Sequence, residues 1–436
     1  MEPGAGHLHV VIIGNGITGV TAALRIRALQ PDWKITMISG ESTYHYSRPA
    51  LMYVFMGHMR YADTKPYPDS FWGEQRIELV RDWVTEIDKG RQRLTLHRAG
   101  TLDYDALLLA TGSKSNMFGW PGQDLGRVQG LYDLMDLRRL YDNVQGARRA
   151  VIAGGGLIGI ELAEMLHSRG VHVTFLVREA SYWNNVLPPE ESAMINRIIT
   201  EAGMDLRLET NLVEIVDDGT GNACAVKTDK DERIECQLVG LTAGVSPNID
   251  LVAGSEIETG RGILVDWSLR TKAAHIYAAG DCAELVDPEG GRNTLQQVWY
   301  TGKLQGRVVG EVIAGREVSY DPGIWYNSAK FLDLEYQTYG RVNMRVPGEQ
   351  SLVWEHANGL HLVRIVHVAG RVIGFNLMGL RYRHKVCEQW IREEREIEYV
   401  LEHLVEANFD PEFFVRYEDE IVRALRAQLT EEAPAA

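Results

Sequence analysis

The sequence predicts an α/β fold with two parallel sheets and a smaller α+β domain that ends in helices. Residues 9–24 (HVVIIGNGITGVTAAL) have the pattern of a buried strand, a glycine-rich turn and a helix, and residues 150–166 (AVIAGGGLIGIELAEML) repeat it. A further apolar run follows each helix, at residues 34–39 and 171–177. Two strand–helix–strand units of this kind each predict a parallel sheet, because the connection between parallel strands is right-handed.

The remaining segments predict how the chain is divided. Residues 119–130 (GWPGQDLGRVQG) are rich in glycine and proline and are typical of a linker. Residues 102–112 (LDYDALLLATG) predict one buried strand that ends at a glycine turn, and residues 325–380 alternate as strands do. After about Arg381 the pattern is helical and charged. We predict three domains: a discontinuous first domain of residues 1–118 and 250–318, a second of residues 119–249, and a third of residues 319–436.

Composition narrows the possible partners. The 436 residues carry a formal net charge of −15, which repels nucleic acid and anionic membrane surfaces. No apolar run approaches the roughly 18 residues of a membrane span, and a first strand near Leu8 leaves no room for a signal peptide. We therefore expect a cytoplasmic protein that binds neither nucleic acid nor membrane.

The four cysteines do not indicate a metal site or a redox dithiol, because none stands in a CxxC or CxxxxC pair. Cys224 and Cys236 flank a predicted hairpin turn and are placed to face each other across it. Free thiols in a reducing compartment are the favoured interpretation, with a disulfide as the alternative.

The glycine turns have the GxGxxG spacing that suits a dinucleotide. The first glycine permits the tight turn, the second lets the backbone approach a pyrophosphate, and the third lets the helix pack closely on the strand. The helix N-terminus then offers free N–H groups to the phosphates. One such pattern is weak evidence, but two copies between strand and helix indicate two dinucleotide sites. The glycines are Gly14, Gly16 and Gly19 in the first turn and Gly154, Gly156 and Gly159 in the second.

The residues after the second strand of each unit bear on which dinucleotide is bound. Glu41 is the nearest acid in the first unit and is suited to a ribose. In the second unit the strand ends at Val177, followed by Arg178 and Glu179. Arg178 is suited to the 2′-phosphate of NADPH, whereas Glu179 is suited to NADH, so both remain open. A nicotinamide carries hydride and a flavin can pass electrons singly, and we therefore expect FAD in one site and NAD(P)H in the other.

Four segments in the same order resemble the FAD- and NAD(P)-dependent pyridine nucleotide-disulfide oxidoreductase superfamily. They are the two glycine turns, LDYDALLLATGS and 276–285 (IYAAGDCAEL), and the resemblance covers about residues 8–315. It implies two Rossmann-like dinucleotide-binding domains. It also implies that Asp281 contacts the ribityl–pyrophosphate side of the flavin and that Glu161 lies near the nicotinamide.

The branch of the superfamily follows from residues 43–57 (TYHYSRPALMYVFMG), which contain no cysteine. The Tyr46-x-Arg48-Pro49 pattern there is similar to the ferredoxin and rubredoxin reductases, the apoptosis-inducing-factor group and the flavin domain of nitrite reductase. The resemblance implies that Arg48 pairs with FAD phosphate. Tyr53 replaces a lysine that many ferredoxin reductases place near flavin N5, so a Lys–Glu pair is not expected here.

A second resemblance to ferredoxin reductases lies in residues 299–306 (WYTGKLQG). It implies that the Trp299 ring stacks beside the isoalloxazine at the electron exit, while a core position is the alternative. We predict Glu161, Tyr53 and Trp299 as catalytic and no metal site. The predicted cofactor-binding residues are Gly14, Gly16, Thr18, Gly19, Glu41, Arg48, Pro49, Ala110, Thr111, Gly112, Gly154, Gly156, Leu157, Ile158, Gly159, Arg178, Gly244, Gly280, Asp281, Val298 and Trp299.

Three functions follow from these features. The first is an NAD(P)H-dependent flavoprotein reductase that passes electrons to a small iron–sulfur protein such as ferredoxin, or to rubredoxin. An acidic carrier would need a local basic patch, for which residues 381–385 (RYRHK) are one candidate and a solvated turn the alternative. The second is an NAD(P)H oxidase or quinone reductase. The third is a redox-responsive interaction protein like the apoptosis-inducing factor. Homodimerisation is an expectation from the superfamily.

The C-terminal segment 413–425 (FFVRYEDEIVRAL) is amphipathic. Its polar face is mostly acidic, which argues against a membrane-surface helix. We expect it to pack on its own domain or on a partner subunit.

Overall fold

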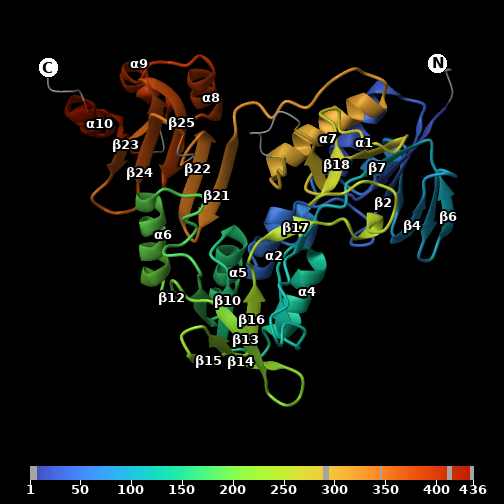
Figure 1. The fold of residues 1–436 in the computed structure, drawn as a ribbon, viewed down its shortest axis with the longest axis horizontal. Helices are drawn as coiled ribbons and strands as arrows, with labels where there is room; N and C mark the ends of the chain where they lie inside the picture. Colours follow the sequence, from blue (N-terminus) through green and yellow to red (C-terminus); the bar gives the residue numbers. More distant parts are fainter. Residues whose placement is uncertain (1–6, 288–293, 344–345, 410–414, 433–436) are drawn as a thin grey trace. The chain divides into compact units, whose positions relative to one another are not determined.

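The computed structural model describes residues 7–287, 294–343, 346–409 and 415–432 of the chain, coloured along the sequence in Figure 1. The chain forms two compact units. Unit 1 comprises Met1–Gly119, Gly126–Ala147 and Gly240–Pro322, and unit 2 comprises Trp120–Leu125, Arg148–Val239 and Gly323–Ala436. The predicted fold class, with two Rossmann-like halves and a C-terminal α+β domain, is confirmed.

Unit 1 is built on a parallel sheet of strand order β19-β7-β1-β2-β3. Its strands are β1 (His9–Ile13), β2 (Lys34–Ile38), β3 (Ile77–Val80), β7 (Ala106–Leu109) and β19 (Ile276–Ala278). The strand order reverses between β1 and β7, and ligands of such sheets bind at the carboxyl ends of the strands at this switch point. The apolar runs seen in the sequence are β1, β2 and β7, and most of their residues are buried.

Two long helices of unit 1 pack closely on each other. They are α1 (Ile17–Leu29) and α7 (Trp299–Ile313). Glycines repeat every four residues along α7, and a Cβ added at Gly306 would lie 2.5 Å from the backbone oxygen of Thr18. A Cβ at Gly310 would lie 2.9 Å from the backbone oxygen of Ala22. The absence of side chains along this stripe therefore allows the two backbones to approach.

One predicted strand of unit 1 is wrong. Residues 102–112 form two strands rather than one, because the chain leaves an antiparallel sheet after Asp103 and enters the parallel sheet at Ala106. The turn between them is fixed by Asp105, whose carboxylate accepts from the backbone N–H of His9 at 2.7 Å. The antiparallel sheet consists of β4 (Val84–Asp88), β5 (Arg93–Leu96) and β6 (Gly100–Asp103).

The shorter elements of unit 1 complete the site and its surroundings. The short strands are β8 (Ser113–Ser115), β9 (Val128–Gln129), β17 (Val245–Pro247), β18 (Ile263–Val265) and β20 (Ala283–Leu285). The short helices are η1 (Arg48–Ala50), α2 (Leu51–Met56), η2 (Tyr61–Thr64), α3 (Phe71–Glu74), α4 (Leu134–Asn143) and η3 (Asp250–Val252).

Unit 2 repeats the parallel arrangement with the order β12-β11-β10-β16. Its elements are β10 (Arg149–Ala153), α5 (Leu157–His167), β11 (His172–Leu176), α6 (Pro189–Glu201), β12 (Asp205–Arg207) and β16 (Leu238–Leu241). An antiparallel sheet of β13 (Leu212–Asp217), β14 (Ala223–Thr228) and β15 (Arg233–Glu235) follows. The predicted hairpin turn lies between β14 and β15. Cys224 and Cys236 are opposite each other there, joined by a backbone hydrogen bond, and both are free thiols.

The C-terminal part of unit 2 is an antiparallel sheet of order β21-β22-β25-β24-β23, with helices packed on it. The strands are β21 (Tyr326–Phe331), β22 (Leu334–Gly340), β23 (Glu349–Glu355), β24 (Leu362–Val368) and β25 (Arg371–Met378). The helices are α8 (His384–Arg392), α9 (Ile397–Glu402), η4 (Leu404–Ala407) and α10 (Glu418–Glu432). Ile421 and Leu425 of α10 are fully buried in the core of this domain. The expectation that this segment packs on its own domain is therefore confirmed for the described residues, while residues 413 and 414 lie outside them.

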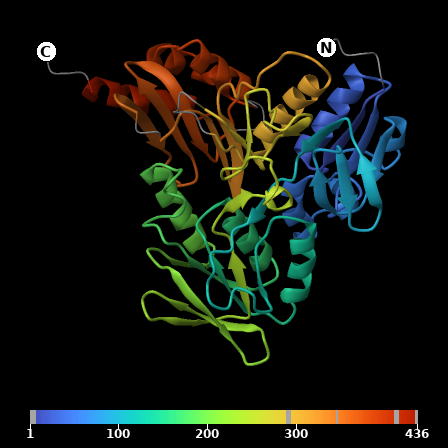
Figure 2. The same cartoon turned by 45° about the vertical axis from the view of Figure 1, so that its right-hand side comes forward.

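Buried ion pairs join the C-terminal sheet to the rest of unit 2, and Figures 1 and 2 show α6 beside this sheet. Arg364 on β24 donates to both glutamates at the start of α6, with 2.8 Å from its Nε to Glu191 Oε1 and 2.5 Å from an NH2 group to Glu190 Oε2. Asn376 on β25 also donates to Glu191, at 3.0 Å. Removing Arg364 or Glu191, which are both buried, would leave a buried charge without its partner, which is strongly destabilising.

Among the helices of the described residues, none combines the length and the apolar character needed to cross a lipid bilayer.

Candidate dinucleotide sites

The first glycine turn lies at the switch point of the unit 1 sheet. Gly14 follows β1 with a φ of +112°, and a Cβ added there would lie 2.1 Å from the backbone oxygen of Ala110 at the end of β7. A Cβ at Gly19 would lie 2.0 Å from the oxygen of Gly14. Gly16 differs, because a Cβ there would meet no atom of the described residues within 4 Å. The outer glycines thus serve close packing, and the middle one borders open space where a pyrophosphate fits.

The start of α1 supplies the donors for that space. Gly16 is the N-cap of α1 and no side chain caps the helix, so its first N–H groups are available to an anion. Thr18, predicted to bind cofactor, is buried and packs against two glycines: its Oγ1 lies 2.4 Å from a Cβ built at Gly280 and 2.9 Å from one built at Gly302.

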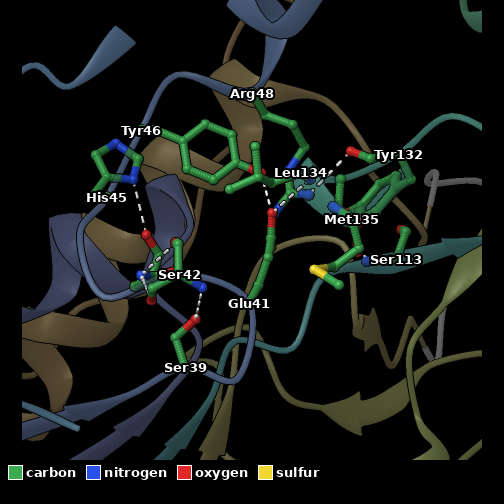
Figure 3. A network of polar contacts seen from close by, with 12 residues as sticks. Ser39, Glu41, Ser42, His45, Tyr46, Arg48, Ser113, Tyr132, Leu134 and Met135 are labelled. Carbon is green, nitrogen blue, oxygen red and sulfur yellow. Dashed lines mark hydrogen bonds and ion pairs between the residues drawn. The ribbon is translucent and has the colours of Figure 1, made fainter. Parts of the chain in front are cut away.

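Glu41 and Arg48 are close together, as Figure 3 shows. Nη2 of Arg48 donates to Glu41 Oε2 at 3.0 Å, and Nη1 donates to the backbone oxygen of Tyr132 at 3.0 Å. Glu41 Oε1 accepts from the Tyr46 hydroxyl and, at 3.0 Å, from the backbone N–H of Leu134 at the start of α4. The predicted ribose and phosphate partners therefore form one network. Pro49 is the next residue of η1 and fixes the backbone direction after Arg48.

Asp281 belongs to a second part of the same network. Its carboxylate accepts from Ser113 Oγ at 3.1 Å and from the Tyr132 hydroxyl at 3.4 Å. Burial raises the pKa of Asp281, while these two hydrogen bonds and the positive charge of Arg48 oppose the rise. The Tyr132 hydroxyl also lies 2.9 Å from a Cβ built at Gly112, which has a φ of +73°. Tyr132 thus links Asp281 to Arg48, over whose guanidinium its ring lies at 4.6 Å.

Other predicted residues take positions around this network. Thr111 donates from its hydroxyl to the backbone oxygen of Asn248 at 2.6 Å. Val298 is the N-cap of α7 and Trp299 its first residue. The Trp299 side chain is 38% exposed and Lys303 lies over its ring at 5.2 Å, so a core position is wrong. The ring of Tyr53 on α2 stacks with that of His58, with 6.2 Å between the ring centroids.

The cysteine next to Asp281 has a structural setting. The Cys282 thiol is fully buried and donates to the backbone oxygens of Leu109 and Ala279, each at 3.4 Å. Burial raises the pKa of this thiol, which disfavours the nucleophilic thiolate.

The second glycine turn follows β10 in unit 2. Gly154 has a φ of +133°, and a Cβ at Gly155 would lie 2.8 Å from a methyl group of Val177. Gly156, like Gly16, has no atom within 4 Å of an added Cβ. Leu157 and Ile158 form the first turn of α5, and Gly159 is buried behind them. Both turns therefore have the open middle glycine that a dinucleotide pyrophosphate requires.

The comparisons with known proteins agree with this geometry. Residues 8–305 match the family Pyridine nucleotide-disulphide oxidoreductase. The chain belongs to this family. It is 30% identical over 312 residues to the ferredoxin–NAD(+) reductase subunit of the benzene 1,2-dioxygenase system of Pseudomonas putida, covering 71% of this chain and 75% of that protein.

Two further proteins are similar over most of the chain. An NADH oxidase of Methanocaldococcus jannaschii is 29% identical over 338 residues, 75% of each chain. The solved structure of a ferredoxin reductase from Rhodopseudomonas palustris superposes with a TM-score of 0.78 at 26% identity, covering 85% of this chain and 91% of that one. The protein is an NAD(P)H-dependent flavoprotein oxidoreductase whose cofactor is FAD.

Of the two charged side chains that follow β11 in this oxidoreductase, Arg178 faces solvent and Glu179 is less exposed. The Arg178 side chain is 76% exposed and donates to Glu179 Oε1 at 2.8 Å. Gly244 was also a predicted cofactor-binding residue. It belongs to unit 1 and has a φ of +89°. A Cβ added there would lie 3.3 Å from the side-chain nitrogen of Asn116.

Glu161 projects from the second turn of α5. Burial, reinforced by the negative charge of Glu164, raises the pKa of Glu161 to about 7. Glu164 is itself paired with Lys330 on β21 at 2.7 Å. A carboxyl with a pKa near neutrality is typical of functional sites, because it holds or releases a proton at working pH.

Sequence reasoning missed several polar residues of the oxidoreductase sites. Gln305, on α7, accepts from the backbone N–H of Gly280 at 2.7 Å and fixes the loop that carries Asp281. Tyr132 joins Asp281 to Arg48, and the Tyr182 hydroxyl donates to the backbone oxygen of Gly156 in the second glycine turn. None has a local pattern that marks it, but His45 and Tyr46 lie inside the segment already singled out for Arg48.

Proposed function

We propose that the protein takes a hydride from NAD(P)H and delivers electrons one at a time to a small iron–sulfur protein such as ferredoxin, or to rubredoxin. FAD, when bound, supplies the conversion of a two-electron donor into a one-electron donor. The observation that carries the proposal is the setting of Cys282, the cysteine beside Asp281. Its thiol is bonded to backbone oxygens and buried, so this cysteine is not suited to act as a redox-active nucleophile beside the flavin.

The roles of the residues follow from their contacts. Gly16 and the start of α1 would hold the FAD pyrophosphate, with Arg48 as a charged donor and Glu41 for the ribose. The Asp281 carboxylate would accept hydrogen bonds from hydroxyl groups of the ribityl side. Ser113 and Tyr132 donate to the same carboxylate and hold it in place. In this assignment residues 1–118 and 250–318 bind FAD, residues 119–249 bind NAD(P)H, and residues 319–436 form an interface domain.

The second site would hold NAD(P)H at the start of α5, with Glu161 near the nicotinamide and Arg178 or Glu179 at the adenosine ribose. Trp299, partly exposed at the start of α7, would be the electron exit, with Tyr53 beside the flavin. The relative from Pseudomonas putida, named as a ferredoxin–NAD(+) reductase subunit, supports the choice of acceptor.

The predicted basic patch at residues 381–385 supports docking of an acidic carrier only weakly. Arg381 forms a bidentate pair with Glu335. The His384 ring stacks on Tyr339 and also contacts the ring of Tyr326. Lys303 beside Trp299 is the cation better placed for a carrier that docks at the proposed electron exit.

Anaerobic reduction followed by reoxidation tests this proposal. The purified protein is reduced with NADH or NADPH, and the return of flavin absorbance is timed with ferredoxin, rubredoxin, a quinone or air. Fast reoxidation by a carrier protein and slow reoxidation by air are expected. Fast reoxidation by air would instead favour the oxidase, the function in the name of the Methanocaldococcus jannaschii relative.

We also propose a cytoplasmic location and a homodimer. The four free thiols suit a reducing compartment. Light scattering coupled to gel filtration tests the dimer. The same measurement with NAD(P)H added tests the redox-responsive interaction function. That function predicts slow turnover and an assembly state that changes when the nucleotide binds.

A further inference from the structure

Each glycine turn has a backbone carbonyl that a buried side chain holds. In the first turn the Asn15 oxygen lies 2.8 Å from His45 Nδ1, and His45 is 7% exposed. In the second the Gly156 oxygen accepts from the Tyr182 hydroxyl at 2.8 Å, in addition to the first helical bond of α5 from the Ile160 N–H at 3.2 Å, and Tyr182 is 0% exposed. Both side chains come from the loop that follows the second strand of their unit, β2 or β11. The bonded carbonyl belongs to the residue after the first glycine in the first turn and to the middle glycine in the second.

The backbone oxygen of Asn15 determines which ring nitrogen of His45 carries the hydrogen. A carbonyl oxygen only accepts, so Nδ1 carries the hydrogen. Burial, aided by the positive charge of Arg48, lowers the pKa of His45, which leaves the ring neutral at pH 7. Asn15 has a second anchor, because its side-chain nitrogen donates to the Ser42 backbone oxygen at 2.8 Å.

Holding these carbonyls fixes where the adjacent N–H groups point. The carbonyl of one residue and the N–H of the next belong to one planar trans peptide and point in opposite directions. Since the Asn15 oxygen faces buried His45, the Gly16 N–H faces the opposite side. The same holds for the Gly156 oxygen and the Leu157 N–H. In both turns the middle glycine borders a space with no atom within 4 Å of an added Cβ.

We propose that His45 and Tyr182 are positioning residues that orient the two phosphate-binding turns toward the pyrophosphates of their dinucleotides. His45 would fix the direction of the Gly16 N–H in the turn that binds FAD, and Tyr182 that of the Leu157 N–H in the turn that binds NAD(P)H. The inference rests on the proposed assignment of the first turn to FAD and the second to NAD(P)H. It goes beyond that assignment because neither residue would touch the dinucleotide, and each acts through a peptide group.

Tyr182→Phe tests the second turn by removing one oxygen atom. The KM for NAD(P)H is expected to rise about tenfold, the effect of one lost hydrogen bond to a buried carbonyl, while kcat and FAD affinity stay as in the natural protein. A merely structural role would instead lower FAD content and kcat together. An unchanged KM would overturn the proposal for this turn.

A matched pair of variants tests the first turn. His45→Leu removes the donor and keeps the side chain apolar and of similar size, whereas the amide nitrogen of His45→Asn can occupy the place of Nδ1. The dissociation constant of FAD, from quenching of flavin fluorescence on titrating the apoprotein, is expected to rise about tenfold in His45→Leu and to stay within about twofold in His45→Asn. The 31P resonances of bound FAD should move in His45→Leu and not in Tyr182→Phe.

Each set of variants is the control for the other, because the His45 variants should change FAD affinity and Tyr182→Phe the KM for NAD(P)H. His97→Leu is the control for loss of an exposed histidine in unit 1. Equal losses of FAD affinity in His45→Leu and His45→Asn would overturn the positioning role. If His45→Leu raised the KM for NAD(P)H and left FAD affinity unchanged, the assignment of the turns would be reversed, and the proposed function would fail instead.

Discussion

The two glycine turns have the same backbone plan and different surroundings. Around the first, Glu41, Arg48 and Asp281 are tied to one another through Tyr132, Tyr46 and the start of α4. Beside the second, Arg178 reaches into solvent and pairs with its sequence neighbour. A site lined by a buried polar network is rigid and suits a resident cofactor, whereas exposed side chains suit a dinucleotide that binds and leaves. This difference is the one expected if the first turn holds the resident FAD and the second holds NAD(P)H, as we propose.

The helices that follow the turns differ as well. At the position where α5 has Glu161, α1 has Thr21, two residues beyond the last glycine of each turn. Thr21 is covered by α7, since a Cβ at Gly306 would lie 3.0 Å from its Cβ. This face of α1 is used for packing and has no room for a carboxylate. The corresponding face of α5 carries one with a raised pKa.

The largest effect is expected at the first turn, where two glycines have opposite surroundings. Gly14→Ala places a Cβ 2.1 Å from a backbone oxygen at a φ of +112° and should prevent unit 1 from folding. Gly16→Ala adds its methyl group to open space, so thermal stability should change little while FAD affinity falls at least about a hundredfold. Thermal unfolding of the apoprotein and FAD titration separate the two. Equal FAD affinity in Gly16→Ala and the natural protein would show that the open space is not the pyrophosphate site.

Arg48→Gln should have the next largest effect. It removes a charged donor from the network, and FAD affinity should fall about thirtyfold, the magnitude of a charge-assisted hydrogen bond. Arg60→Gln is the matched control, since Arg60 is an exposed arginine that pairs only locally with Asp63 among the described residues. A similar loss in both variants would point to net charge rather than to a phosphate contact.

Arg178 tests the other side of the comparison. If it binds a 2′-phosphate, Arg178→Ala should lower kcat/KM for NADPH about tenfold and leave kcat/KM for NADH unchanged. The smaller loss than at Arg48 is expected because the side chain is exposed and screened by solvent. Steady-state kinetics with both nucleotides measure it, and Glu179→Gln shows the reverse preference if the acid binds the ribose. An equal loss with both nucleotides would contradict a 2′-phosphate contact.

The smallest effect concerns pH. Because the pKa of Glu161 is raised from 4.5 to about 7, the folded protein retains a proton there that the unfolded chain releases above about pH 4.5. Stability should therefore fall as pH rises from about 4.5 to 7, and the cost persists above pH 7. Glu161→Gln should raise the unfolding temperature by a few degrees at pH 8 and by almost nothing at pH 4. Thermal scans at both pH values, with the exposed Glu201→Gln as control, check this; a rise at both pH values would contradict it.

The sequence was enough to predict the strands, turns and helices whose pattern is local. Gly14 and Gly154 mark their turns because a positive φ favours glycine, and the apolar runs before them are strands with both faces buried. The residues 102–112 were predicted as one strand because nothing in LDYDALLL shows that Asp105 bonds to His9, distant in sequence.

The candidate site was predicted only in part for the same reason. Tyr132 and Gln305 act on Asp281 across long sequence separations, and no spacing rule links them. Thr18 stands inside the GxGxxG turn, and nothing in that local pattern indicates that its hydroxyl lies against Gly280 and against Gly302 of α7. Which side of a turn faces a ligand depends on the helix that packs behind it.

The packing of α1 on α7 has a consequence for how the protein is made. The two helices are separated by about 280 residues, so α1 leaves the ribosome long before its partner exists. At the usual pace of synthesis this interval is roughly 15 to 60 s. During that time the apolar edge of β7, which β19 later covers, has no neighbouring strand on that side. Unit 1 therefore completes its core late, and the nascent chain must be kept from aggregating until residues beyond Ile313 have emerged.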